Sequence, residues 1–239
     1  MLNRPLLIAG CIIPALLMNM QAFADGAVVD KIYNPYVETL EREIEYRFIV
    51  QNDDSDSLDG VQLHRLGLGL SWTDRWFSEV YLIGERTNSD SLSVEAYELE
   101  TKWQITEQGE FWADWGLLFE LEAERDKSIW EYGTTLLTSK EWGRWVTTAN
   151  LGLIYEWGSD IANEWETTLS VQGRYRLSEA FEPALEFYTG QDTKALGPVF
   201  TGLIRTGGRT KLRWEVGLIF GLDTASPDQT FRGLLEFEF

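Results

Sequence analysis

The sequence predicts an all-β protein: a transmembrane, antiparallel, up-and-down β-barrel of about twelve strands. Apolar and polar residues alternate in segments of ~10 residues, the length that a tilted membrane strand requires. Eleven Trp, nine Tyr and twelve Phe occur in a chain that is 25% charged. A soluble core holding these aromatics would also bury the glutamates between them. A barrel with lipid outside and water inside resolves that conflict.

The strands are expected in twelve alternating segments after a short leader. The clearest is 110–124, where Phe111 and Phe119 share one face and Asp114 and Glu120 share the other. Such a face pattern is typical of a strand between two different environments. The twelve segments are 36–50, 60–73, 75–86, 92–104, 110–124, 129–139, 143–157, 164–176, 181–189, 195–205, 209–221 and 230–239.

The ninth and tenth segments are the weakest strands of this set. Pro183 and Pro198 each lack an N–H donor for the ladder, so a bulge or a shortened strand is expected there. The strand count therefore lies between ten and twelve.

Connections between the segments alternate between short turns and longer loops rich in Asp, Ser and Asn. The short turns are 73–74, 105–109, 140–142, 177–180 and 206–208; the loops are 51–59, 87–91, 125–128, 158–163, 190–194 and 222–229. Aromatic residues gather near both ends of the strands, as at two membrane interfaces. Tyr36, Trp72, Trp76, Trp103, Phe111, Trp145, Tyr175 and Phe239 lie toward the turns, and Phe48, Trp130, Trp157, Trp165 and Phe231 toward the loops.

The chain ends in an alternating run, 231–239, whose last residue is Phe239. Phe237 and Phe239 match the C-terminal signature of bacterial outer-membrane β-barrels, which this ending resembles; Gly233 lies one place from its usual position. The resemblance implies that Phe237 and Phe239 act as the membrane insertion signal read by the barrel-assembly machinery. It also implies that the barrel contacts outer-membrane lipid and lipopolysaccharide, is a monomer, and has both termini in the periplasm. No subfamily is identified.

The first 24 residues read as a secretory signal peptide. Arg4 precedes the apolar stretch 6–20, and Ala22 and Ala24 form an A-x-A cleavage site. The apolar stretch is too short for a membrane anchor. Lipidation at Cys11 is the alternative, but it would leave only 6–10 as the apolar region. The expected organisation is a signal peptide (1–24), a periplasmic leader (25–35) and an outer-membrane barrel (36–239).

Cys11 is the only cysteine of the chain, so the mature protein is expected to hold no disulfide and no zinc–cysteine site. No nucleotide fingerprint or histidine-rich metal site occurs, and no cofactor is expected. The formal net charge of −19 argues against a nucleic-acid partner, whose phosphates require a basic surface.

The inward face of the predicted barrel is mostly acidic. A twelve-strand barrel has a backbone radius of about 12 Å, which leaves a passage of at most roughly 10 Å between side chains. Acidic side chains in such a passage favour cations, whereas pairing of Glu with Arg across it would fill it instead. The candidate lumen and selectivity residues are Glu41, Glu43, Glu45, Arg47, Glu98, Glu100, Lys102, Asp114, Glu120, Glu122, Glu166, Arg174, Arg176, Arg213, Glu215, Glu236 and Glu238.

Strand register predicts two ion pairs in this lumen. Lys102 is expected near Asp114 across a short turn, and Arg213 near Glu238 across the last loop.

Two further features invite a chemical interpretation. His64, the only histidine, could form a lipase-type pair with a distant partner such as Ser93, but no serine lies two residues away; a rim histidine is the alternative. Loop 51–59 carries Asp53, Asp54, Asp56 and Asp59, a pattern that can bind calcium. It lacks the Gly and distal Glu of an EF-hand, so solvated aspartates without a metal are the alternative interpretation.

The sequence thus favours a narrow passive channel or transporter for small cationic or neutral polar solutes. A closed structural or adhesive barrel with a charge-filled lumen, a lipid-modifying outer-membrane enzyme and a soluble lipocalin-like barrel are the alternatives.

Overall fold

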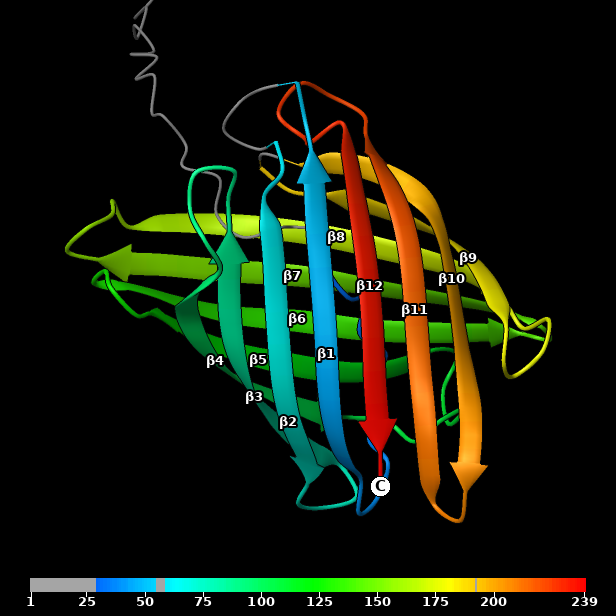
Figure 1. Ribbon diagram of the computed structural model, residues 1–239. Coiled ribbons are helices and arrows are strands. Elements are labelled where there is room, and N and C mark those ends of the chain that lie inside the picture. The colour runs from blue at the N-terminus through cyan, green and yellow to red at the C-terminus, as the bar shows by residue number, and fades with distance from the viewer. Residues whose placement is uncertain (1–28, 55–58, 192) are drawn as a thin grey trace, which may run out of the picture.

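The computed structural model describes residues 29–54, 59–191 and 193–239, and it forms a closed barrel of twelve antiparallel strands (Figure 1). The predicted class and strand number are confirmed. Ala22 and Ala24 of the expected cleavage site lie outside the described residues. The strands are β1 (Arg42–Asn52), β2 (Gln62–Ser71), β3 (Trp76–Arg86), β4 (Ser93–Gln104), β5 (Asp114–Glu124), β6 (Ile129–Trp142), β7 (Trp145–Gly158), β8 (Glu164–Tyr175), β9 (Glu182–Thr189), β10 (Lys194–Gly207), β11 (Thr210–Gly221) and β12 (Gln229–Glu238).

Each strand pairs with its neighbours in sequence, and β12 pairs with β1 to close the ring. The closing ladder runs from Glu43 opposite Glu238 to Asn52 opposite Gln229. The backbone N–H of Phe239 donates to the carbonyl of Arg42 at 2.9 Å, so the last residue is held by this closure.

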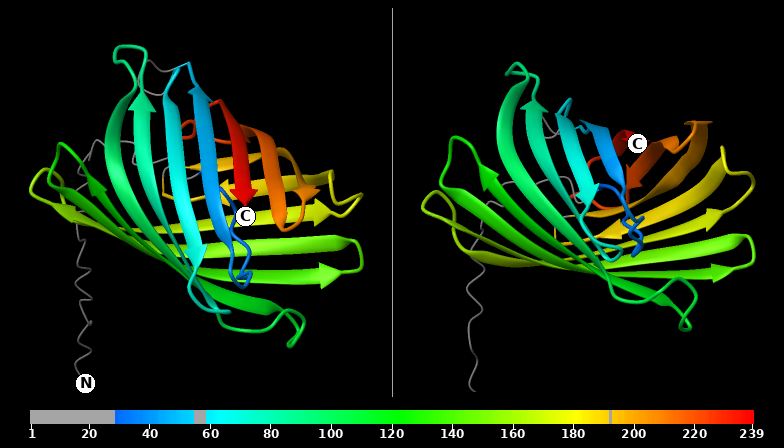
Figure 2. Two further views of the ribbon diagram at one scale, coloured as in Figure 1. Left: turned by 60° about the horizontal axis from the view of Figure 1, so that its bottom comes forward. Right: turned by 90° about the horizontal axis from the view of Figure 1, so that it is seen from below.

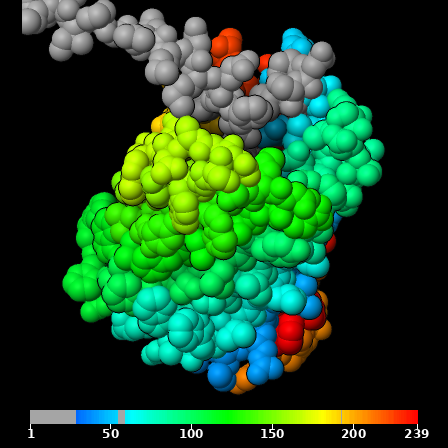
Figure 3. Space-filling view, turned by 90° about the vertical axis from the view of Figure 1, so that its left-hand side faces the viewer, coloured from blue at the N-terminus to red at the C-terminus, as the bar shows by residue number. Residues whose placement is uncertain are grey.

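The barrel is flattened. Strands β1–β3 and β10–β12 form one side and cross β5–β8 of the other side at a steep angle (Figures 1 and 2). Strand tilt and right-handed twist produce this crossing, because opposite walls of a tilted barrel lean in opposite directions. The outer surface is continuous where the middle strands face the viewer (Figure 3). No helix among the described residues is long and apolar enough to cross a membrane.

Side chains alternate across the wall as the sequence predicts. On β2, Leu66, Leu68 and Leu70 are 46%, 57% and 52% exposed on the outside, while the intervening glycines face inward. Gly67 makes room for its neighbours, because a Cβ there would lie 2.1 Å from Oε1 of Glu79. The outer surface is therefore an apolar band and the inner surface a polar one.

Aromatic pairs mark both ends of this band. At the turn end, the rings of Trp76 and Trp103 stack with centroids 5.3 Å apart. At the loop end, Tyr155 and Trp165 lie 4.6 Å apart. Tyr36 was expected at the turn-side interface, but it lies in the lumen, because its hydroxyl donates to Asp114 at 2.7 Å.

The short connection after β4 differs from its prediction. It spans 105–113 rather than 105–109, so Lys102 lies opposite Leu118 and not beside Asp114. Both side chains still face inward, but the shift in register separates them, so the prediction of this ion pair is wrong. The other expected pair is confirmed: Arg213 lies opposite Glu236 and also reaches Glu238, with Nη2 and Oε1 3.4 Å apart.

The largest departure from the sequence-based expectation concerns residues before β1. The first strand begins at Arg42, and residues 29–37 run through the inside of the barrel, here called the lumen segment (Figure 2). At the loop end, Val29 and Ile32 pack with Tyr188 and Ile219. At the turn end, the N–H of Val37 donates to Gln104 at 2.7 Å. The described part of the expected periplasmic leader is thus inside the barrel.

Candidate functional site in the lumen

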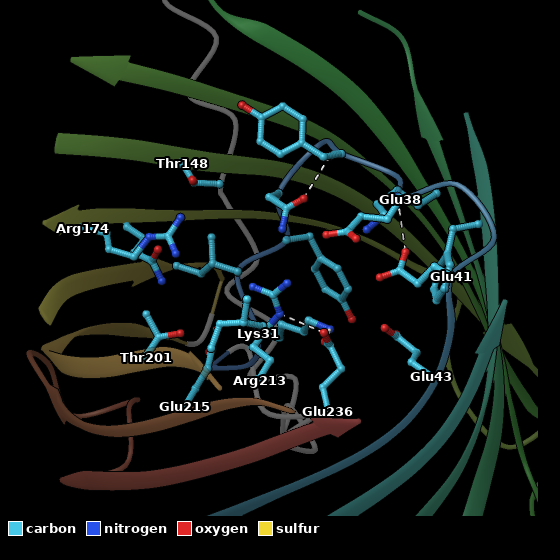
Figure 4. Close-up of a pocket in the computed structure, with 18 of the residues that line it drawn as sticks. Lys31, Glu38, Glu41, Glu43, Thr148, Arg174, Thr201, Arg213, Glu215 and Glu236 are labelled. Carbon is cyan, nitrogen blue, oxygen red and sulfur yellow. Dashed lines mark hydrogen bonds and ion pairs between the residues drawn. The ribbon is translucent and has the colours of Figure 1, made fainter. Parts of the chain in front are cut away.

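The lumen segment is held by ion pairs near its loop end. Asp30 Oδ1 lies 2.5 Å from Nη1 of Arg47, and Asp30 Oδ2 lies 3.6 Å from Arg65. The next residue, Lys31, places Nζ 2.5 Å from Glu45 and 3.1 Å from Glu236. Figure 4 shows Lys31 and Glu236. Adjacent residues of opposite charge thus each meet opposite charges on the wall, which compensates the cost of burying them.

Hydrogen bonds fix the segment further along the lumen. Tyr33 and Asn150 of β7 exchange two bonds of 2.8 Å, from backbone N–H to the side-chain oxygen and from the amide nitrogen to the backbone carbonyl. The hydroxyl of Tyr33 donates to Glu100 of β4 at 2.6 Å. Because Lys31 contacts β1 and β12 and Tyr33 contacts β7, the segment reaches opposite walls and divides the lumen.

One wall of the lumen, formed by β9, β11, β12 and β1, is here called the paired wall because each arginine has acidic partners. Arg47 and Arg232 are 0% exposed. Arg232 Nη2 lies 3.0 Å from Glu186 and 3.2 Å from Glu215. Charge-assisted pairs of this kind hold the arginines rigidly and compensate their charge.

The wall formed by β3–β6 differs and is here called the acidic wall. Its inward carboxylates stand opposite one another across the ladders, because the alternation of β4, β5 and β6 places Glu in the same two rows. One row pairs Glu79 with Glu100 and Glu100 with Glu120; the next pairs Glu98 with Glu122 and Glu122 with Glu131.

Two cations adjoin the acidic wall. Arg65 of β2 lies 3.1 Å from Glu98 and 3.8 Å from Glu122. Lys102 lies nearer the turns, with Nζ 5.3 Å from the ring centroid of Phe77. Six carboxyl groups stand against two cations, so this wall has an excess of acidic groups, and such groups attract cations and repel anions when they are ionised.

A cavity of about 290 Å³ lies between the lumen segment and the walls (Figure 4). Its lining includes Lys31, Glu43 and Glu79 in the lumen, and Glu38 and Glu179 near the short turns. The cavity therefore links the charged interior with the turn end of the barrel.

The structure places the predicted lumen residues on the inner side of the barrel or on the cavity. Those buried are Glu43, Glu45, Arg47, Glu98, Glu100, Asp114, Glu236 and Glu238; those partly buried are Glu41, Lys102, Glu120, Glu122, Glu166, Arg174, Arg176, Arg213 and Glu215. Arg174 pairs with Glu182 at 2.8 Å and Arg176 with Glu141 at 2.6 Å, near the turn end.

Several residues of the site were not among the predicted ones. Asp30, Lys31 and Tyr33 belong to the expected leader, and the mixture of apolar and charged residues in 29–33 was the available signal of an ordered segment. Glu131 follows from alternation within 129–139, where it shares a face with Ile129 and Gly133.

The histidine and the acidic loop lie elsewhere. His64 faces outward on β2, where its Nδ1 lies 2.7 Å from the hydroxyl of Tyr46 and its ring stacks on Phe48. Asp56 of the acidic loop lies outside the described residues. Within the described ranges, three carboxylates approach within 4.8 Å at Glu43, Glu45 and Glu236.

Comparisons with known proteins give a fold and no family. No family model matches the chain, and no curated protein matches it. Among solved structures, the chain is similar to the KdgM porin in complex with disordered oligogalacturonate, with a TM-score of 0.55 and 14% identity over 82% of this chain and 99% of that one. An outer-membrane channel from Pseudomonas putida F1 gives 0.55 and 15% over 88% and 98%. The NanC porin gives 0.51 and 12% over 84% and 99%.

These likenesses show the fold of bacterial outer-membrane barrels. The recognition of the chain as an outer-membrane β-barrel is confirmed by this agreement together with the closed twelve-strand ring.

Proposed function

We propose that the protein is a narrow passive channel of the bacterial outer membrane for small cationic or neutral polar solutes. The acidic wall carries this proposal: Glu98, Glu100, Glu120 and Glu122 face the lumen in two adjoining rows. The short turns face the periplasm in this proposal, as in barrels of this class, so the cavity communicates with the periplasmic side. Phe237 and Phe239, on the terminal strand, serve the assembly machinery.

The route for solutes follows the acidic wall rather than the paired wall. Arg47 and Arg232 are fully buried among their partners, so these two arginines offer no positive charge that would attract anions. The carboxylate excess of the acidic wall concentrates cations and raises the barrier for anions. Passage requires the lumen segment to shift, because its residues contact both sides of the lumen.

Planar-bilayer recordings in a KCl gradient test this function. We expect a reversal potential whose sign indicates a preference for cations. Replacement of Glu120 and Glu122 by Gln should reduce that preference. Glu107→Gln is the matched control, because Glu107 is exposed in a short connection, pairs with Arg75 and does not line the cavity. Anion preference in the unmodified protein would contradict the proposal.

A closed structural barrel is the second candidate. The filled lumen favours it, because the segment and the wall exchange several buried ion pairs. Absence of conductance both in the unmodified protein and after removal of residues 29–37 would favour this candidate.

A further inference from the structure

We propose that Lys31 occupies a binding site for primary ammonium groups, formed by Glu43, Glu45, Glu79 and Glu236, and that amine solutes compete with Lys31 for it. That solutes reach this site rests on the proposed channel function; the site itself does not.

The carboxylates of the site converge where they would otherwise repel. Oxygen atoms of Glu43, Glu45 and Glu236 lie within 4.8 Å of one another, and all three residues are buried. Like charges at such distances in a desolvated place require a cation between them. Lys31 supplies it, with Nζ at 2.5 Å from Glu45 and 3.1 Å from Glu236.

A fourth carboxylate is directed to the same place and has capacity left. Glu79 lies in the same row as Glu43, two strands away across Gly69. It is 2% exposed and leaves its Oε1 without a hydrogen-bond partner. Its Oε2 accepts a 2.6 Å bond from Tyr81, whose hydroxyl also contacts Glu45 at 3.2 Å. The wall therefore holds more acceptors than Lys31 uses.

The composition of the site favours an organic ammonium over a metal ion. An ammonium group has three donors and is attracted to aromatic faces, and Nζ of Lys31 lies 5.3 Å from the ring centroid of Tyr33. Calcium instead takes six to eight oxygen ligands at about 2.3–2.6 Å. The side chain of Lys31 is itself an alkylammonium group bound by these carboxylates. It therefore occupies the place that we propose for an amine ligand.

The cavity supplies a path to the site. Lys31, Glu43, Glu79 and Glu236 all line the cavity of about 290 Å³ that extends to the short turns. Figure 4 shows Lys31, Glu43 and Glu236 facing this space from the segment and from two strands. An amine entering from the turn end meets the carboxylates that Lys31 now satisfies.

Chemical rescue tests the proposal in detergent micelles, without transport. Lys31→Ala removes the ammonium group and three of the four methylenes of the side chain, and leaves their space. n-Butylammonium is expected to raise the thermal midpoint of this variant saturably, whereas n-butanol should not. Neither compound should act on Lys127→Ala, whose lysine pairs with Glu124 next to an outer loop. The double variant Lys31→Ala, Glu45→Gln should lose most of the rescue.

The outcomes separate this inference from the channel function. If Lys31→Ala folds poorly, refolding yield with and without n-butylammonium replaces the midpoint, with the same expected contrast. No effect of n-butylammonium, or an equal effect of Mg²⁺ or Ca²⁺ alone, would overturn the ammonium site. Rescue without cation-selective conductance would leave the site standing and refute the channel; selective conductance without rescue would do the reverse.

Discussion

The two walls of the lumen differ in how their buried charged side chains are compensated. On the paired wall, each buried arginine meets carboxylates, as Arg232 does with Glu186 and Glu215. On the acidic wall, Glu faces Glu across successive ladders, with Arg65 contacting two of them. On the paired wall the buried arginines are held and compensated by their partners, whereas on the acidic wall the carboxyl groups outnumber the cations beside them. In the proposed channel, the paired wall would hold the barrel together and the acidic wall would select what passes.

Breaking the paired wall should give the largest effect on stability. Arg47→Met removes the nearest cation of Asp30, which keeps only Arg65 at 3.6 Å, and one of the two cations of the buried Glu45. Loss of one partner of a buried pair costs about 3–5 kcal/mol. Urea unfolding in lipid vesicles measures this loss. The exposed pair of Arg205 with Glu179 supplies the control, because Arg205→Met should change the unfolding free energy by about 0.5 kcal/mol or less.

The acidic wall should respond in the opposite way. Glu120→Gln removes one of three carboxylates in a row with Glu79 and Glu100, so like-charge repulsion falls. We expect the unfolding free energy to stay within about 1 kcal/mol of the unmodified protein or to rise. Glu236→Gln, on the paired wall, should lower it by about 2 kcal/mol or more, because it contacts Lys31 and Arg213. Equal losses at the two positions would remove the distinction between the walls.

A smaller effect is expected outside the lumen. His64→Ala removes a hydrogen bond with Tyr46 and a stacking contact on the outer face, worth about 1 kcal/mol. We expect phospholipid hydrolysis at background level in both the unmodified protein and the His64→Ala variant. Activity that disappears with His64 would restore the lipid-modifying enzyme as the function.

The strands were predictable because each wall separates two environments. Alternation places Glu98, Glu100 and Lys102 on one face whatever the exact register, so the inward set follows from periodicity alone. Turn length is not encoded in that periodicity, which is why the connection 105–113 shifted the expected partner of Lys102.

The course of the lumen segment could not be read from the sequence in the same way. Residues 29–37 have no strand period, and their position depends on partners more than ten residues away in the chain, such as Glu45, Asn150 and Glu236. The Lys31 site exists only once β1 and β12 close the ring, because Glu45 and Glu236 face each other across that closure.

The most direct test of the account is the reversal potential of the protein lacking residues 29–37, recorded beside that of the complete chain. Removal of the segment uncovers the acidic wall and the carboxylates that Lys31 satisfies. We predict a several-fold larger conductance with a stronger preference for cations. An unchanged conductance, or a shift toward anions, would contradict the claim that the acidic wall selects and the lumen segment occupies its path.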